Sequence, residues 1–111
     1  MTEFAHIMFL LIAAHALADY PLQGDFLAQA KNRHTDIGKH IWPHGLIAHS
    51  FIHGGFVFVV TGSAVLGVFE IVAHAVTDWL KCENKISYTV DQAIHIGCKV
   101  LWSALIVGGL M

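Results

Sequence analysis

The stretch FAHIMFLLIAAHALADY, residues 4–20, decides the fold class of this chain. It is an apolar run almost long enough to cross a bilayer, whose hydrocarbon core of about 30 Å needs about 20 apolar residues in a helix. Within the run lie two ionisable residues four positions apart, His15 and Asp19. A membrane helix tolerates such residues where they face other helices, so the stretch predicts one span of a bundle.

The composition of the whole chain agrees with a membrane protein. Hydrophobic residues make up 56% of the 111 residues and charged residues only 13%, against roughly a quarter in soluble domains. The formal net charge of −2 offers no basic surface, so we expect no nucleic-acid partner. Cys82 lies in a polar loop and Cys98 in an apolar segment, and we expect both to be free thiols.

The first apolar run has one feature of a signal peptide, because Ala16-Leu17-Ala18 resembles a cleavage site. The preceding residues MTEFAH include Glu3 and no Lys or Arg, so the positively charged start of a signal peptide is missing. We therefore expect the run to be retained as the first span.

Four apolar stretches are long enough for membrane helices: residues 3–20, 43–61, 63–81 and 90–110. They predict an all-α, integral membrane up-down bundle of four transmembrane helices that forms a single domain over residues 1–111. The segment GDFLAQAKNRHTDIGKH, residues 24–40, begins with apolar residues at helical spacing. We expect a short interfacial helix there after the first span, with a solvated connector as the alternative.

Local signals set the expected boundaries of these helices. Pro21 disfavours helix at the residue before it, and Pro43 suits a first helical turn. Gly62 belongs to a tight turn between the second and third spans. Thr89 and Gln92 have the spacing of a capping box and predict the start of the last helix.

The basic residues predict the orientation of the bundle. The first and third loops carry basic residues and the second has none, the set being Lys31, Arg33, Lys39, Lys81 and Lys85. Because positive charge favours the cytoplasmic side, we expect loops one and three in the cytoplasm and both termini outside.

Each apolar stretch carries polar residues at i,i+4 spacing, which places each set on one helix face. The sets are His15 and Asp19; His49 and His53; Glu70, His74 and Asp78; and Asp91, His95 and Lys99. The order of His and Asp inverts with helix direction, so an up-down bundle brings the residues of each kind to one height. The expected layers are His15, His49, His74 and His95, then Asp19, Asp78 and Asp91 nearer the cytoplasm, and His53, Glu70 and Lys99 deeper.

Imidazoles and carboxylates gathered at one depth indicate a divalent metal site, with a purely structural polar network as the alternative. We expect zinc, with manganese or iron as alternatives, and one or two ions. Some of the residues would orient a ligand imidazole instead of binding metal. The candidate ligands are His15, Asp19, His49, His53, His74, Asp78, Asp91 and His95. The loop and edge residues His34, His40 and His44 give only a weak indication of a metal role.

Glu70 has two alternative roles. We expect it first to form a buried ion pair with Lys99, because either charge alone is costly inside a membrane. In the functional alternative Glu70 is catalytic and accepts a proton from metal-bound water.

At these residues the chain resembles a family of small bacterial and phage membrane proteins catalogued as domain of unknown function 3307. The resemblance rests on HALADYPLQGDFLAQAKNR (15–33), HGLIAHSFIHG (44–54), HAVTDWLK (74–81) and DQAIH (91–95). It implies a multi-pass membrane fold in a bacterial inner membrane, or in a host membrane for a phage protein, and brings no established activity. The His and Asp pairs are also similar to those of inner-membrane proteins described as metal-dependent hydrolases.

Two classes of function fit these observations. The first is a membrane-embedded metal-dependent hydrolase near the cytoplasmic leaflet, acting on a lipid or phosphoester-type substrate, with metal-activated water as the nucleophile. The second is a non-enzymatic membrane protein that handles metal ions or relays protons. Membrane lipids are expected partners in both. Hydrolysis needs a coordination position open to the cytoplasm, whereas a structural site is closed.

Overall fold

The computed structural model describes residues 2–110, and these residues form five helices and no strand. The helices are α1 (Thr2–Asp19), α2 (Gly24–Ala30), α3 (Gly38–Thr61), α4 (Ala64–Cys82) and α5 (Tyr88–Val107). The predicted all-α class is confirmed. Cys82 and Cys98 are both free, as expected.

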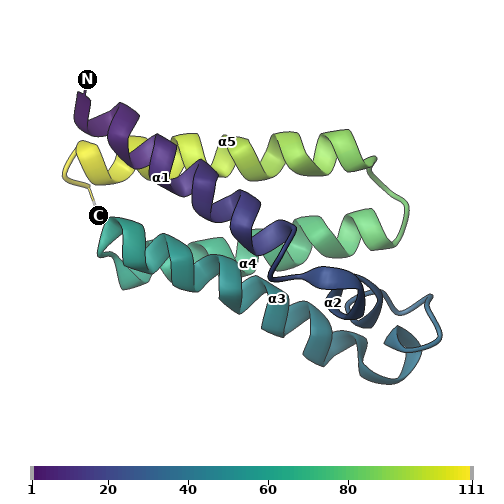
Figure 1. The fold of residues 1–111 in the computed structure, drawn as a ribbon. Helices are drawn as coiled ribbons and strands as arrows, with labels where there is room; N and C mark the ends of the chain where they lie inside the picture. The colour runs from purple at the N-terminus through teal and green to yellow at the C-terminus, as the bar shows by residue number, and fades with distance from the viewer. Residues whose placement is uncertain (1, 111) are drawn as a thin grey trace.

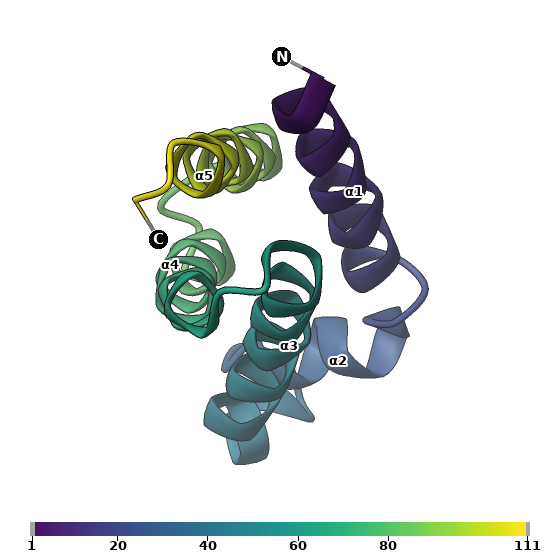
Figure 2. The same ribbon diagram turned by 90° about the vertical axis from the view of Figure 1, so that its left-hand side faces the viewer.

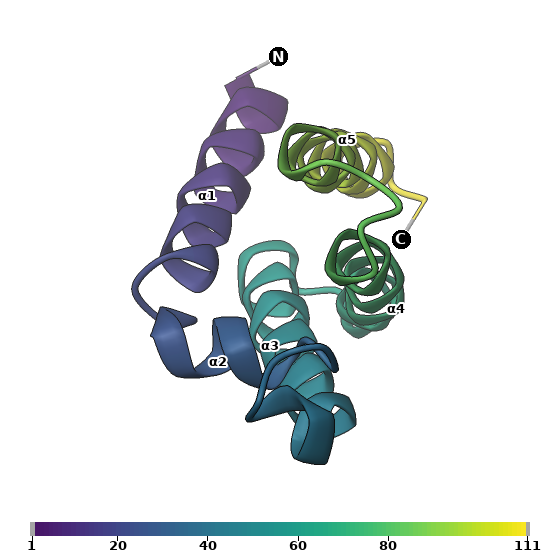
Figure 3. The ribbon, with the colours of Figure 1, turned by 90° about the vertical axis from the view of Figure 1, so that its right-hand side faces the viewer.

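The four long helices run alternately up and down (Figure 1). The start of α1 and the end of α5 lie at one end of the molecule, beside the turn between α3 and α4. The short helix α2 and the loop between α4 and α5 lie at the opposite end, which we call the α2 end. Figures 2 and 3 look along the molecule and show α4 and α5 end-on, with α1 and α3 inclined to them.

Within the described residues, two helices, α3 and α5, are long and apolar enough to cross a membrane. The pair α1 and α2, bent by 82° at its break, adds a third candidate if it counts as one span. Helix α4 has 19 residues but contains Glu70, Asp78 and Lys81, which lower its hydropathy. The structure therefore supports two or three candidate spans, where the sequence analysis predicted four.

Two predicted helix boundaries are corrected by the structure. Helix α3 begins at Gly38, five positions before the predicted start, and is kinked where Ile41 leaves helical geometry (φ −135°, ψ 17°). Pro43 follows the kink and lies in the first turn of the straight part, where a missing N–H costs no helical bond. Helix α5 is capped by the Ser87 hydroxyl, which accepts from the Val90 amide at 3.1 Å. Thr89 and Gln92 therefore do not start that helix.

Helix α2, the predicted short helix after the first span, packs against the bundle only at its C-terminal end, while Phe26 stays 60% exposed. Its last residue, Ala30, is buried, and so is Lys31. The reason is a close approach to α3 at Gly45, where an added Cβ would lie 2.6 Å from the Ala30 carbonyl carbon. A side chain at position 45 would push α2 away, so this glycine lets α2 close against the bundle.

The distribution of polarity is inverted relative to a soluble protein. Among residues 3–110, glycine apart, fourteen buried residues are polar or charged and eight are hydrophobic. Large apolar side chains face outward instead, for example Phe9 at 73% and Val59 at 76% exposure. Soluble domains bury such side chains and leave charged ones outside. The surface is therefore suited to an apolar surrounding medium.

Candidate metal centre

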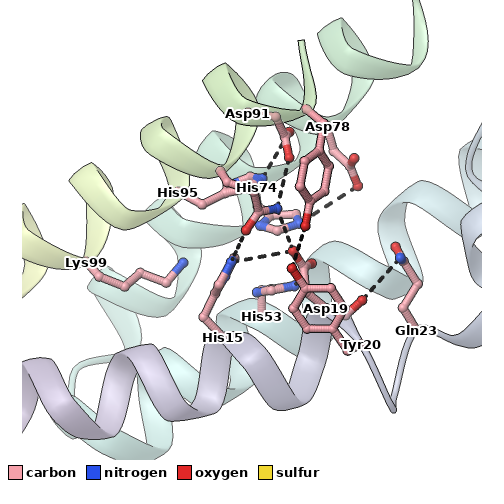
Figure 4. A network of polar contacts seen from close by, with 12 residues as sticks. His15, Asp19, Tyr20, Gln23, His53, His74, Asp78, Asp91, His95 and Lys99 are labelled. Atoms are coloured by element: carbon pink, nitrogen blue, oxygen red, sulfur yellow. Dashed lines mark hydrogen bonds and ion pairs between the residues drawn. The ribbon is translucent and has the colours of Figure 1, made fainter. Parts of the chain in front are cut away.

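Five histidines from all four long helices meet inside the bundle, and Figure 4 labels four of them, His15, His53, His74 and His95. The imidazole of His74 on α4 lies at the middle, stacked on those of His53 at 3.7 Å and His95 at 4.1 Å between ring centroids. His49 lies 4.9 Å from His74, and His15 lies 5.1 Å from His53. The sequence pattern placed His53 one turn deeper, but its ring belongs to the same layer as the other four.

Asp19 is the carboxylate that most closely joins this histidine layer. Its Oδ1 accepts a hydrogen bond from His53 Nε2 at 2.9 Å and lies 3.2 Å from His49 Nε2. Its Oδ2 accepts from Gln92 Nε2 at 2.9 Å and lies 3.4 Å from His15 Nε2. Helix α1 ends at Asp19, so this side chain lies where the bundle interior meets the α2 end.

Several buried ring nitrogens in this layer have no hydrogen-bond partner. Both nitrogens of His49 and both of His74 are in this condition, although neither side chain is exposed to solvent. Unpaired polar atoms in a dry interior are costly and call for a ligand. Asp19, His49, His53 and His74 each offer one ligand atom, all within 4.8 Å of one another. The arrangement could hold a metal ion.

The other two aspartates have different neighbours. Asp78 Oδ2 lies 2.8 Å from Lys31 Nζ, and Asp78 Oδ1 lies 3.3 Å from Lys81 Nζ. Asp91 Oδ1 lies 3.2 Å from His95 Nε2, and its Oδ2 accepts from the Gln92 amide at 3.2 Å. Asp78 and Asp91, both predicted ligands, thus lie beside the other predicted ligands but outside the group that contains Asp19.

Glu70 and Lys99 form the buried ion pair that the sequence predicted. Lys99 Nζ donates to Glu70 Oε1 at 2.8 Å, and the indole Nε1 of Trp102 donates to the same oxygen at 2.8 Å. The other oxygen, Oε2, lies 3.3 Å from His74 Nδ1. Glu70, His74 and His95 make a second group of three whose ligand atoms lie within 4.8 Å of one another.

The polar interior is closed at the end opposite α2. One helical turn beyond the polar residues, an apolar cluster fills the centre, formed by Leu11, Val57, Leu66 and Trp102. At the α2 end the side chain of Asp19 is 10% exposed, and the hydroxyls of Tyr20 and Tyr88 contact each other nearby. Among the eight candidate ligands, Asp19 therefore has the most exposed side chain, and it lies at the α2 end.

Two polar residues of the centre were not predicted as part of it. Gln92 connects helices α1 and α5, because its Oε1 accepts from His15 Nε2 at 2.9 Å while its amide donates to Asp19. Its spacing of three residues from His95 was a signal that could have identified it, because residues at i,i+3 share a helix face. No spacing of polar residues along a helix indicated Lys31. It reaches Asp78 only because α2 packs on α3.

Loop histidines lie away from the centre. His34 Nε2 is 2.9 Å from Glu83 Oε2, and Arg33 donates to both oxygens of Glu83 at 2.6 Å. These partners, Arg33 first, lower the pKa of Glu83 to about 2. Neither metal-capable group found among the described residues includes His34, His40 or His44.

The comparisons with known proteins give the family of the chain. The profile of the family described as protein of unknown function DUF3307 matches residues 7–108, and the chain belongs to this family. No curated protein and no solved structure matches the chain. The weaker likeness to inner-membrane metal-dependent hydrolases is therefore not shown.

Proposed function

We propose that the chain is an integral membrane protein in which all four long helices are spans. Its apolar surface and polar interior support this proposal. Helix α4 fits it despite its charges, because Glu70 and Asp78 face the interior while Val68 and Val72 are 55% and 59% exposed on the outer face. A helix whose charges are paired inside a bundle does not expose them to lipid. The membrane is the inner membrane of a bacterium, or a host membrane for a phage protein.

Labelling of single cysteines tests this arrangement. With Cys82 and Cys98 replaced by alanine, we expect Leu110→Cys to react with a membrane-impermeant maleimide in intact cells. Lys85→Cys should react only after the cells are opened, since positive-inside logic places its loop in the cytoplasm. Labelling of Lys85→Cys in intact cells would reverse the orientation, and release of the protein by carbonate extraction would overturn the membrane assignment.

The function that the geometry supports best is binding of a divalent transition metal, zinc first, with manganese or iron as alternatives. The main observation is the group of Asp19, His49, His53 and His74, in which the ring nitrogens of His49 and His74 make no hydrogen bond. Three imidazoles and one carboxylate are a ligand set that zinc accepts. Asp19 also lacks a lysine partner, so a cation would neutralise it directly.

Elemental analysis of the protein in detergent, purified without chelator, tests this function. We expect stoichiometric metal in the wild type and its loss in His49→Ala and His74→Ala. His6→Ala is the matched control, because His6 is an exposed histidine outside the centre. A wild-type protein without metal after incubation with zinc, or ligand variants that keep their full content, would contradict the proposal.

A metal-dependent hydrolase is the second proposal, supported by the partly exposed Asp19 at the α2 end and the apolar cluster at the other end. The exposed edge of Asp19 would face the cytoplasmic leaflet near the lipid headgroups, where a lipid or phosphoester-type substrate could approach. Hydrolysis needs one coordination position for water, and Asp19 is the most exposed member of the group, at 10%. The apolar cluster at the far end favours a one-sided site over a proton relay across the membrane.

Turnover measurements separate the hydrolase from a metal-binding protein without catalysis. Zinc-loaded protein would be incubated with phosphatidic acid and with p-nitrophenyl phosphate in mixed micelles. Zinc-dependent hydrolysis that is lost in His49→Ala and kept in His6→Ala would support the enzyme. Glu70→Gln tests the catalytic role of Glu70, since a general base is worth about 100-fold or more in rate. Bound zinc without turnover would favour metal handling.

A further inference from the structure

The three-residue group of Glu70, His74 and His95 has the spacing of a metal site and lies on the deeper side of the histidine layer. All three side chains are at most 2% exposed. Glu70 Oε2 is free of the lysine and the indole, which both hold Oε1, and it faces the imidazole of His74. This oxygen is therefore available to a further ligand.

The distance between Glu70 Oε2 and His74 Nδ1 is informative. It is 3.3 Å, yet His74 Nδ1 makes no hydrogen bond, because the pair lacks the required direction. Two ligand atoms about 2.0–2.1 Å from one tetrahedral zinc lie about 3.3 Å apart. His49 Nε2 and Asp19 Oδ1 show the same combination, because they lie 3.2 Å apart and His49 Nε2 makes no hydrogen bond. Both groups contain a nitrogen and an oxygen with the spacing of metal ligands.

His74 belongs to both groups, and its two ring nitrogens face different neighbours. Nδ1 faces Glu70, whereas Nε2 lies 3.8 Å from the Asp78 oxygen that is itself 3.7 Å from His49 Nε2. We propose that a second divalent ion binds between Glu70, His74 and His95, and that the imidazolate of His74 bridges it to the first ion. This inference rests on the proposed binding of the first ion by Asp19, His49, His53 and His74.

The proton and charge balance predicts an order of binding. The first ion coordinates one nitrogen of His74 and leaves the other protonated, and the second ion displaces that proton to the solvent. The first ion meets Asp19, which has no lysine partner. The second meets Glu70, which Lys99 already neutralises. Repulsion by the Lys99 ammonium therefore makes the second site the weaker one.

The bridge assigns Glu70 a role different from that of a general base. In the bridged centre Glu70 is a ligand that the uncharged Trp102 indole holds in orientation through its other oxygen, whereas the Lys99 ammonium on that oxygen repels the ion. Neighbours that fix a ligand in this way raise metal affinity. A Glu70 that only paired with Lys99 would have no influence on the number of ions bound.

Copper is the probe for the bridge, because its unpaired electron reports coupling between ions. Chelator-treated protein in detergent would be titrated with Cu²⁺ and followed by electron paramagnetic resonance. We expect the first equivalent to give a mononuclear signal and the second to diminish it, since an imidazolate couples two copper ions antiferromagnetically. Two bound ions with independent signals would overturn the bridge, and one ion per chain would overturn the second site while the first stands.

Variants assign the second ion to its ligands, with zinc stoichiometry as the readout. Glu70→Gln should bind one ion, and Lys99→Met should bind the second ion about tenfold or more tightly, because the repelling charge is gone. Lys85→Met, in the exposed loop, is the matched control and should leave both affinities unchanged. Unchanged second-site affinity in a folded Lys99→Met protein would contradict the placement.

If neither variant folds, the copper titration of the wild type tests the second site. A wild-type protein that binds no ion at all would contradict the proposed metal-binding function itself.

Discussion

The two halves of the bundle interior differ in chemistry although the same four helices build both. Toward the α2 end the facing side chains are histidines and carboxylates, and toward the other end they are Leu11, Val57, Leu66 and Trp102. On α1 the change occurs within one turn, between Leu11 and His15, and on α3 between His53 and Val57. Helix packing alone therefore stabilises the apolar half, whereas the polar half also needs groups of opposite charge or hydrogen-bond partners for its charged side chains.

In the membrane proposed above, surrounding lipid changes how each half is stabilised. Apolar side chains gain little from leaving a lipid environment, because the surrounding hydrocarbon is equally apolar. The apolar half is therefore held by close packing, such as the contact of α3 with α4 at Gly54, where an added Cβ would lie 2.7 Å from the Gly67 carbonyl oxygen. In the polar half, unpaired charges are costly, so pairing determines stability, and the proposed metal would add to it.

The ion pair at the border of the halves gives the largest expected effect. Glu70→Gln or Lys99→Met alone should lower the free energy of unfolding by about 3–5 kcal/mol, because each leaves the other charge buried without a partner. The double variant should recover most of that loss. Unfolding by SDS in mixed micelles with chelator present measures it. A double variant as unstable as the single ones would show that the pair is not coupled.

Leu66→Ala tests the apolar half. We expect it to lower the free energy of unfolding by about 2 kcal/mol, at the lower end of the range for core leucines, because lipid removes the transfer contribution and leaves the cavity. Its zinc content should equal that of the wild type. Asp19→Asn is the counterpart in the polar half and should lose zinc. Loss of zinc in Leu66→Ala would mean that the halves are not independent.

Gln92→Ala tests how the polar half is organised. Gln92 holds His15 and Asp19 in place from α5, and loss of such a partner weakens metal binding by about 10–100-fold. Competition with a zinc indicator measures this affinity. Gln29→Ala on the exposed side of α2 is the control and should bind zinc like the wild type. An unchanged affinity in Gln92→Ala would exclude a positioning role.

Acid titration tests the contacts outside both halves and gives the smallest expected effect. The pKa of Glu83 is lowered from 4.5 to about 2 in the folded protein by Arg33 and His34. A lowered pKa means that Glu83 stabilises the fold above about pH 4.5 and loses this contribution as the pH falls to about 2. The stability difference between wild type and Glu83→Gln should shrink over that interval. Asp36→Asn, at an exposed loop carboxylate, should show no such change.

Much of the candidate centre could be predicted from the spacing of residues along single helices. The i,i+4 sets and the alternating direction of the helices brought His15, His74 and His95 to one height, and the same reasoning predicted the pair of Glu70 and Lys99. These predictions depend only on helix periodicity and on an up-down order. The metal itself stays a prediction.

The sequence alone establishes which helix faces are polar and at what height along the bundle their polar residues lie, because helix rise and periodicity are the same in any fold. Only the tertiary structure decided how the side chains meet across helices. It brought the ring of His53 into the histidine layer, directed Lys31 from α2 onto Asp78, and placed Asp19 against His49 and His53. The physical reason is that these contacts depend on the inclination of α1 and α3 and on the close approach of α2 at Gly45, which no local pattern encodes.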